Sequence, residues 1–263
     1  MTISDDYENK LNRMNRASQN VSLGTLLKQV DNVINSGSPI EELNIISNST
    51  DTPITFIQNG SGSVIKIGSE NDYLSITNYG EIRLTGSAIV WDDLRFPASA
   101  INPPGGIGGA AVDTVDTPFI GTLLFDPASV EICVGQAQMP HGWKEGSYLS
   151  PHVHWSPIST STGSVVWRLS CETANVGEAY NGSYTYISEV ASYSDGTLND
   201  HILSDFSDLD MTGKTISNMT LWRISRMATS GSDTYPQDAR LLEFDIHYQI
   251  DSLGSNAEYL KNG

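Results

Sequence analysis

The chain has 263 residues, of which 38% are apolar and 17% are charged, so it is long enough and apolar enough to bury a hydrophobic core. Its 31 acidic and 14 basic side chains give a formal net charge of −17 at pH 7, which repels a phosphate backbone. The sequence has no run of about 18 apolar residues, and its first residues, MTISDDYENK, lack the pattern of a signal peptide. These features argue against nucleic acid as a partner and predict no membrane insertion and no conventional secretion.

The two cysteines, Cys133 and Cys171, lie in strand-like segments and form no C-x-x-C pair. This predicts buried free thiols rather than a disulfide framework or a zinc site. The glycine-rich GGIGG at 105–109 has no strand before it and no helix after it, so it does not resemble a phosphate-binding loop. No nucleophile elbow leads into a helix. We therefore expect no cofactor and no enzymatic activity.

Residues 1–40 contain the one segment with a helical pattern. Leu23, Leu26, Val30 and Val33 follow the 3-4-3 spacing of an apolar seam. Two heptads are too short to form an isolated helix in water, so the helix needs a partner. We predict a docking helix that packs against copies of itself or against another protein. The polar stretch before it is interpreted as an extended arm or, equally, as a disordered tail.

Residues 41–93 are predicted to form a short shaft of β-repeats. Turn-forming clusters, NGSGS, GSEND and NYGE, separate very short apolar segments. A meander this small leaves one apolar face bare, which three intertwined chains would cover. The alternative is a single sheet that packs on the rest of its own chain. The apolar pairs are Ile54/Phe56, Ile65/Ile67, Leu74/Ile76 and Ile82/Leu84, and Phe56, Ile67, Ile76 and Leu84 are predicted to line the trimer axis.

Residues 94–116 are rich in glycine and proline and are predicted to be a linker, whereas 117–255 are predicted to form an almost wholly β head, followed by a tail at 256–263. Antiparallel strands with no helical pattern between them favour a two-sheet jelly-roll sandwich, so the overall fold class is mainly β. The strands are predicted at 118–125, 129–138, 151–156, 164–172, 183–191, 200–205, 218–228 and 240–250. Alternation places Val165, Trp167, Leu169 and Cys171 on one face, and likewise Leu242, Phe244, Ile246, Tyr248 and Ile250.

Three of the five histidines lie in the stretch PHGWKEGSYLSPHVHW at 140–155. Strand alternation puts His152 and His154 on the face opposite Val153 and Trp155, and His247 on the polar face of the last strand. His152, His154 and His247 are therefore candidate ligands of iron, zinc or manganese.

The segment GSYLSPHVH also resembles the first half of the cupin signature, with Gly146 before His152 and His154. Ile158 and Ser159 stand where that signature has a glutamate, and no proline–glycine turn precedes the last histidine. The favoured interpretation is a tight turn at HGWKEGS, with histidines that hydrogen-bond across strands or subunits and hold no metal. His141 and His201 are interpreted as ordinary loop histidines.

Three blocks of sequence resemble a family of virion structural proteins of tailed bacteriophages and prophages, described as head-fibre or tail-fibre-like proteins. They are IVWDDLRFPASAI at 89–101, AQMPHGWKEGSYLSPHVHW at 137–155 and LLEFDIHYQIDSLGS at 241–255. The resemblance covers about 89–255 and implies an N-terminal docking segment, a short intertwined shaft and a compact β-head in a trimer. It carries no catalytic assignment.

The sequence thus predicts a non-enzymatic homotrimeric head fibre or decoration protein, assembled in the host cytoplasm and docked on capsid or tail proteins through residues 1–40. One alternative is a tail fibre or adhesin that binds carbohydrate on the host surface, for which the eleven tyrosines and five tryptophans could supply a sugar-binding surface. The other alternative is a cupin-like metal enzyme that uses His152, His154 and His247.

Overall fold

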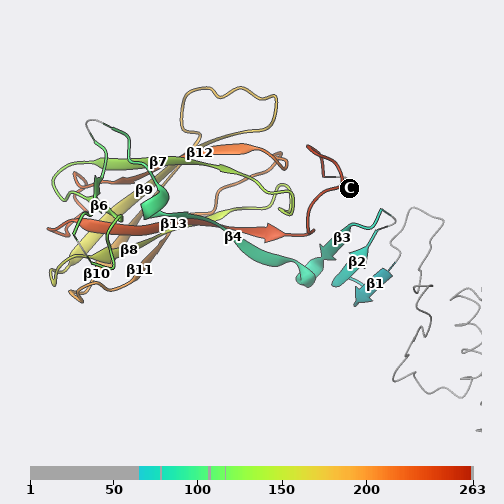
Figure 1. The fold of residues 1–263 in the computed structure, drawn as a ribbon, viewed down its shortest axis with the longest axis horizontal. Coiled ribbons are helices and arrows are strands. Elements are labelled where there is room, and N and C mark those ends of the chain that lie inside the picture. The colour runs from blue at the N-terminus through green and yellow to red at the C-terminus, as the bar shows by residue number, and fades with distance from the viewer. Residues whose placement is uncertain (1–64, 78, 106–107, 116, 262–263) are drawn as a thin grey trace, which may run out of the picture. The chain divides into compact units, whose positions relative to one another are not determined.

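The computed structural model in Figure 1 describes residues 65–77, 79–105, 108–115 and 117–261. The predicted docking helix, with Leu23, Leu26, Val30 and Val33, lies outside these residues, and so does Phe56. In the described residues no helix has the length and apolar character needed to cross a bilayer.

The first described element is a small antiparallel sheet of three strands: β1 (Ile65–Gly68), β2 (Tyr73–Ile76) and β3 (Ile82–Thr85). The free edge of β3 is hydrogen-bonded to the chain just beyond the last strand, because the Leu84 amide donates to the Asp251 carbonyl at 2.7 Å. Alternation along the three strands leaves six aliphatic side chains on one face of this sheet: Ile65, Ile67, Leu74, Ile76, Ile82 and Leu84.

Two further antiparallel sheets form a β-sandwich (Figure 1). One sheet has the order β10-β9-β12-β7, and the other has the order β11-β8-β13-β6-β5, with β4 also paired to β13. The sandwich strands are β4 (Val90–Pro97), β5 (Ala111–Val112), β6 (Leu123–Phe125), β7 (Glu131–Gln138), β8 (Ser150–Pro157), β9 (Gly163–Ala174), β10 (Tyr186–Ser194), β11 (Ile202–Asp205), β12 (Met219–Arg226) and β13 (Ala239–Ile250), with short 3₁₀ turns η1 (Gly86–Ala88) and η2 (Ala98–Ala100).

The pairing of these strands is nested along the chain. β4 pairs with β13, β7 with β12, β8 with β11 and β9 with β10, and every pair is antiparallel. This is the winding of a jelly roll, in which the first strand returns to lie beside the last. Mainly β structure and an antiparallel sandwich are therefore confirmed, and each of the eight strands predicted between 118 and 250 is present.

The predicted linker at 94–116 requires correction, because the sandwich starts at Val90 and not near 117. The end of β4, the η2 turn and β5 all fall within 94–116. β4 is an edge strand that turns only Leu94 and Phe96 toward the core, while its other residues are largely exposed. A strand with so few buried side chains gives a weak apolar signal, and the following glycines and prolines hide it further.

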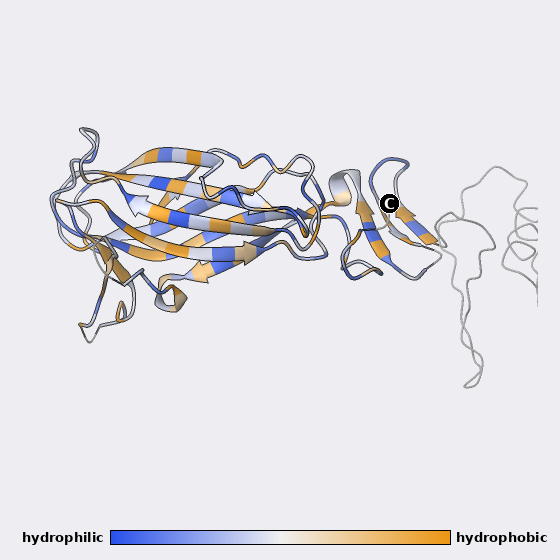
Figure 2. Cartoon of the chain, turned by 90° about the horizontal axis from the view of Figure 1, so that it is seen from above, coloured by the Kyte–Doolittle hydropathy of each residue, from blue (hydrophilic) through white to orange (hydrophobic). Residues whose placement is uncertain are grey.

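The core lies between the two sheets and is rich in aromatic side chains. The alternating colours along the sandwich strands in Figure 2 show the hydrophobic positions that supply it. Trp155 and Trp167 are fully buried, and the ring of Phe125 packs edge-on against Trp167 at 5.1 Å. Cys133 and Cys171 are free and buried as predicted, and burial raises the pKa of each thiol to about 12.

One predicted core position in the last strand is displaced by a single residue. A β-bulge between Leu241 and Glu243 shifts the register of β13 against β8. Leu241 is consequently buried while Leu242 is only half-buried, although Phe244 and Ile246 keep their predicted places in the core. An extra residue in one strand moves the preceding side chains to the other face, which simple alternation does not anticipate.

A fully buried arginine ties together the chain around the end of β12. Arg226 donates to both carboxylate oxygens of Asp233, at 3.1 and 2.9 Å. It also donates to the carbonyls of Phe125, Gln237 and Tyr235, at distances of 2.9, 2.7 and 2.6 Å. Every side-chain nitrogen of this cation therefore has a partner, which is the condition for burying a charge at tolerable cost.

Candidate functional site

The histidines singled out in the sequence lie on the outer face of the β11-β8-β13-β4 sheet. Val153 and Trp155 of β8 are buried in the core, so alternation directs His152 and His154 to the opposite face. In β13 the same rule places His247 outward. The three histidines therefore do not line the interior of the sandwich, and a cupin-like enzyme that used them would need a site on the outer face of the sheet.

Strand register aligns one charged row across four strands. Asp245 of β13 lies opposite Arg95 of β4 on one side and opposite His152 of β8 on the other. His152 in turn lies opposite Asp205 of β11. Side chains directly opposite each other in an antiparallel sheet are close enough to interact, so this register creates the site.

The row is centred on a contact between His152 and Asp245. The Nε2 of His152 lies 2.5 Å from Oδ1 of Asp245, and the two residues are only 4% and 5% exposed. The geometry of this contact is not that of a regular hydrogen bond, and Oδ1 forms no other hydrogen bond with the described part of the chain. The other oxygen, Oδ2, lies 3.3 Å from Nε2 of His154, whose Nδ1 is 2.6 Å from Nε2 of His201. One imidazole of this histidine pair must donate and the other must accept.

His247 completes the cluster on the side of β4. Its ring centroid is 4.3 Å from that of His152, and its Nε2 lies 3.1 Å from Oδ1 of Asp93. The His152 and His154 rings are also close, with centroids 5.0 Å apart. Three imidazoles this close together cannot all carry a positive charge without strong repulsion.

The electrostatics of the cluster shift three of its groups. Burial lowers the pKa of His152, but the contact with Asp245 outweighs burial, and the pKa is raised overall. Burial is the main reason that the pKa of His154 is lowered, and the charge of neighbouring His152 adds to it. The pKa of Asp245 is also lowered, because the contact with His152 more than offsets the effect of burial. The metal-free cluster thus favours a carboxylate beside one protonated imidazole.

The donor set of the cluster suits a metal ion. One ligand atom each from His152, Asp245 and His247 lies within 4.8 Å of the others. Two imidazoles with a carboxylate are a common ligand set for zinc and iron. His154, the third predicted candidate, instead contacts Asp245.

Two members of the cluster, Asp245 and His201, were not among the candidate ligands chosen from the sequence, although Asp245 was placed on the polar face beside His247. His201 was expected to be an ordinary loop histidine, but its ring stacks on His154 with centroids 4.9 Å apart. Asp245 carried a usable signal, since it lies two residues before His247 and so shares its face. His141 is separate from the cluster and contacts the hydroxyls of Ser255 and Ser217.

The tight turn predicted before these histidines is also present. Gly146 has a positive φ of 73°, and the amide of Ser147 donates to the Lys144 carbonyl at 3.1 Å. The stretch at 140–155 therefore both turns the chain and supplies a histidine cluster.

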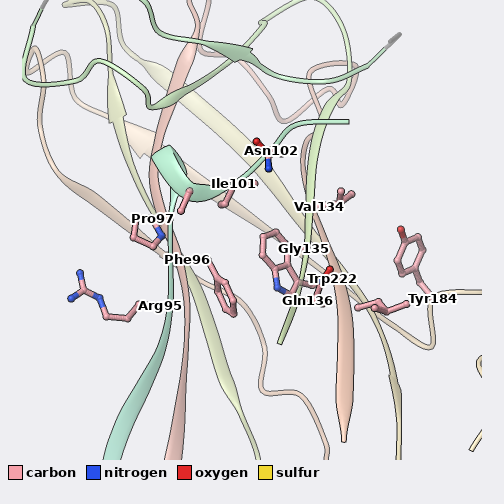
Figure 3. Close-up of a pocket in the computed structure, with 12 residues that line it drawn as sticks. Arg95, Phe96, Pro97, Ile101, Asn102, Val134, Gly135, Gln136, Tyr184 and Trp222 are labelled. Carbon is pink, nitrogen blue, oxygen red and sulfur yellow. The ribbon is translucent and has the colours of Figure 1, made fainter. Parts of the chain in front are cut away.

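A separate cavity of about 610 Å³ lies between β4 and β7, the strands at one side of the sandwich (Figure 3). Phe96 and Tyr184 supply aromatic surface, whereas Trp222, which also lines the cavity, is only 2% exposed. Among the described residues the buried indole nitrogen of Trp222 has no hydrogen-bond partner. Gly135 is required beside it, because an added Cβ would come within 2.3 Å of the Trp222 ring. A concave aromatic surface with a few polar groups is typical of small-ligand sites.

The predicted shaft residues inside the described chain share one surface. Ile67, Ile76 and Leu84 all lie on the six-residue face of β1–β3 defined above, which we call the aliphatic face. All six of its members are half-buried or exposed, and Ile67 is 64% exposed. Val90 and Trp91, at the start of β4, are also exposed.

No protein-family model matches the chain, and no curated protein matches it. Among solved structures, it is similar to the crystal structure of the CBM36-1 domain of a multidomain xylanase from the hindgut metagenome of Trinervitermes trinervoides. The TM-score is 0.34 and the sequence identity is 11%, over 59% of this chain and 96% of that domain. A likeness at this level assigns neither a ligand nor an activity to the present chain.

Proposed function

We propose that the chain is a non-enzymatic structural protein of a tailed-bacteriophage particle, a homotrimeric head fibre or decoration protein. The observation that carries this proposal is the aliphatic face of β1–β3. Its Ile67, Ile76 and Leu84 are the residues that the β-repeats predict to line a trimer axis, and none of them is buried within the chain.

The size of this sheet favours several copies over one. Each strand has four residues, and a sheet of three such strands is marginal in water unless its apolar face is covered. Full burial of one leucine or isoleucine side chain contributes about 1.5–3 kcal/mol, and covering the aliphatic face would add the part of this that each half-buried or exposed member still lacks. Three copies around one axis cover three such faces at once.

The place of the protein in a particle is proposed from the sequence blocks at 89–101, 137–155 and 241–255, which resemble virion proteins. Residues 1–40 would dock on a capsid or tail protein. Two free cysteines suit assembly in a reducing cytoplasm, and the net charge of −17 limits adhesion to packaged nucleic acid.

Mass photometry at micromolar concentration tests the assembly. We expect a species of three 28.5 kDa chains, about 86 kDa, for the wild type. Ile67→Asp and Leu84→Asp place a charge on the aliphatic face and should give the monomer. Lys66→Asp, on the opposite face of the same strand as Ile67, is the matched control and should remain trimeric. A monomeric wild-type protein would contradict the proposed trimer.

Particle purification tests the location. In a lysate of the phage that encodes the chain, the full-length protein should sediment with particles, and a variant lacking residues 1–40 should remain in the soluble fraction as a folded trimer. Normal incorporation of the truncated variant would overturn the docking role, and a wild-type protein absent from the particles would overturn the virion role.

A second candidate function, a host-surface adhesin that binds carbohydrate, is favoured by the cavity between β4 and β7. Its Phe96 and Tyr184 rings suit the apolar faces of a sugar. A glycan array should then give hits that Tyr184→Ala abolishes and that Tyr193→Ala, an exposed tyrosine on β10 outside the cavity, preserves. An array without hits would contradict the adhesin function and leave the structural virion role as the remaining proposal.

A further inference from the structure

We propose that His152, Asp245 and His247 bind one divalent transition-metal ion of the zinc type on the outer face of the sandwich. The ligand atoms of the three residues already lie within 4.8 Å of one another. Zinc–nitrogen and zinc–oxygen bonds of about 2.0–2.2 Å place tetrahedral ligands about 3.3–3.6 Å apart, so His152 and Asp245, now in contact at 2.5 Å, must rotate apart to admit the ion. This site does not depend on the trimer or on the particle.

The strands fix the positions of the three ligands. His152 and Asp245 are directly opposed in the β8–β13 register, and His247 follows Asp245 on the same face of β13. The backbone of two paired strands therefore holds the cluster together before any ion binds. A site built on regular strands is more rigid than one built on loops.

In the metal-free cluster the two oxygens of buried Asp245 are contacted by His152 and His154, at 2.5 and 3.3 Å. The His152 contact lacks the geometry of a regular hydrogen bond, and a metal ion would replace it. A buried carboxylate requires a nearby positive charge, yet protonation of all the crowded imidazoles would be repulsive. A divalent ion supplies the positive charge from a single centre and lets both histidine ligands remain neutral.

Neighbouring side chains are placed to orient the ligands. Oδ1 of Asp93 lies 3.1 Å from Nε2 of His247, so it contacts the ring of that ligand. His154 lies 3.3 Å from Oδ2 of Asp245, and His201 contacts His154 in turn. Carboxylates and imidazoles that hold metal ligands in this way typically strengthen binding about 10- to 100-fold.

The burial of the cluster indicates how the ion would act. His152 and Asp245 are buried, whereas the His247 side chain is 42% exposed, so an ion can enter from the side of His247. Three protein ligands leave a fourth position for water. The bound ion would cross-link β8 to β13 and, through Asp93, brace β4, the edge strand that connects the small sheet to the sandwich.

Isothermal titration with Zn²⁺ tests the site, using full-length protein purified without a histidine tag and stripped with EDTA. We expect one equivalent per chain with micromolar or tighter affinity, and a rise in the melting temperature on addition of the metal. His247→Ala and Asp245→Asn should each weaken binding by at least about tenfold. His141→Ala, which removes a histidine outside the cluster, is the matched control and should bind as the wild type does.

His247 decides the outcome because its side chain is half-exposed and its replacement should leave the fold intact, which circular dichroism checks. Co²⁺ gives a second measurement, since its visible absorption reports a low-coordinate nitrogen and oxygen site. The proposal is overturned if the wild type shows no saturable binding, or if His247→Ala binds Zn²⁺ as tightly as the wild type. Either result would identify the cluster as an ion pair only.

Discussion

Two buried charged clusters lie in the same sandwich and differ in how completely they are paired. Around Arg226, every side-chain nitrogen has a partner, and both oxygens of Asp233 accept from the guanidinium. Around Asp245, one buried oxygen forms no regular hydrogen bond and three imidazoles crowd the carboxylate. We call the first the closed cluster and the second the open cluster.

The difference teaches how to separate structural from binding roles. A closed cluster gains nothing from a further ligand, because it has no free donor or acceptor to offer. In the open cluster the groups that pair with the carboxylate are imidazoles, which can themselves bind a metal ion. Both clusters are buried and charged, so these two properties do not distinguish a structural cluster from a binding site. The hydrogen-bond partners of each polar atom do.

The closed cluster should show the largest effect on stability. Arg226→Met removes the cation and leaves Asp233 buried without its partner, so we expect a loss of about 3–5 kcal/mol in the free energy of unfolding. Urea denaturation of the full chain measures this. Zn²⁺ should not restore the loss. A change below about 1 kcal/mol would show that the closed cluster is not needed for folding.

The same contrast explains what could be predicted from the sequence. Strand alternation is local, so the sequence alone located the eight strands, and it also placed His152, His154 and His247 on a polar face. Their partners depend on register between strands far apart in the chain, such as Asp93 with His247 or His201 with His154. The bulge after Leu241 and the exposed edge strand β4 likewise follow from tertiary pairing.

The closed cluster was not anticipated for the same reason. Arg226 ends a strand, and the carbonyls that it binds belong to Phe125, Tyr235 and Gln237, which no local pattern connects to it. A lone arginine at the end of a strand is usually exposed, so only the folded arrangement identifies it as buried.

The open cluster should give an intermediate effect that depends on pH. In EDTA, Asp245→Asn removes the carboxylate beside His152, and we expect a loss of about 1–3 kcal/mol in the free energy of unfolding. The raised pKa of His152 contributes stability below its ordinary value of 6.5, and this is lost as the pH rises through the folded pKa. The lowered pKa of Asp245 contributes stability above its ordinary value of 3.8, and this is lost as the pH falls through the folded pKa.

The difference between wild type and Asp245→Asn should therefore be largest between pH 3.8 and 6.5 and should shrink on both sides. Thermal melts from below pH 3.8 to above pH 6.5, with EDTA throughout, measure the profile. A difference that is independent of pH would mean that the His152–Asp245 contact is not an ion pair in the metal-free protein.

An exposed pair should show the smallest effect and sets the baseline for both clusters. Arg168 donates to Glu189 across β9 and β10 at 2.6 Å, and both side chains are about a third or more exposed, at 32% and 42%. Water and salt screen such a pair, so Arg168→Gln should change the free energy of unfolding by less than about 1 kcal/mol in urea denaturation. The three pairs have comparable distances, and therefore their expected ranking tests burial and pairing rather than proximity. If Arg168→Gln lowered the free energy of unfolding as much as Asp245→Asn, burial would add nothing to the pairing of Asp245. The argument for an ion at Asp245 would then be weaker.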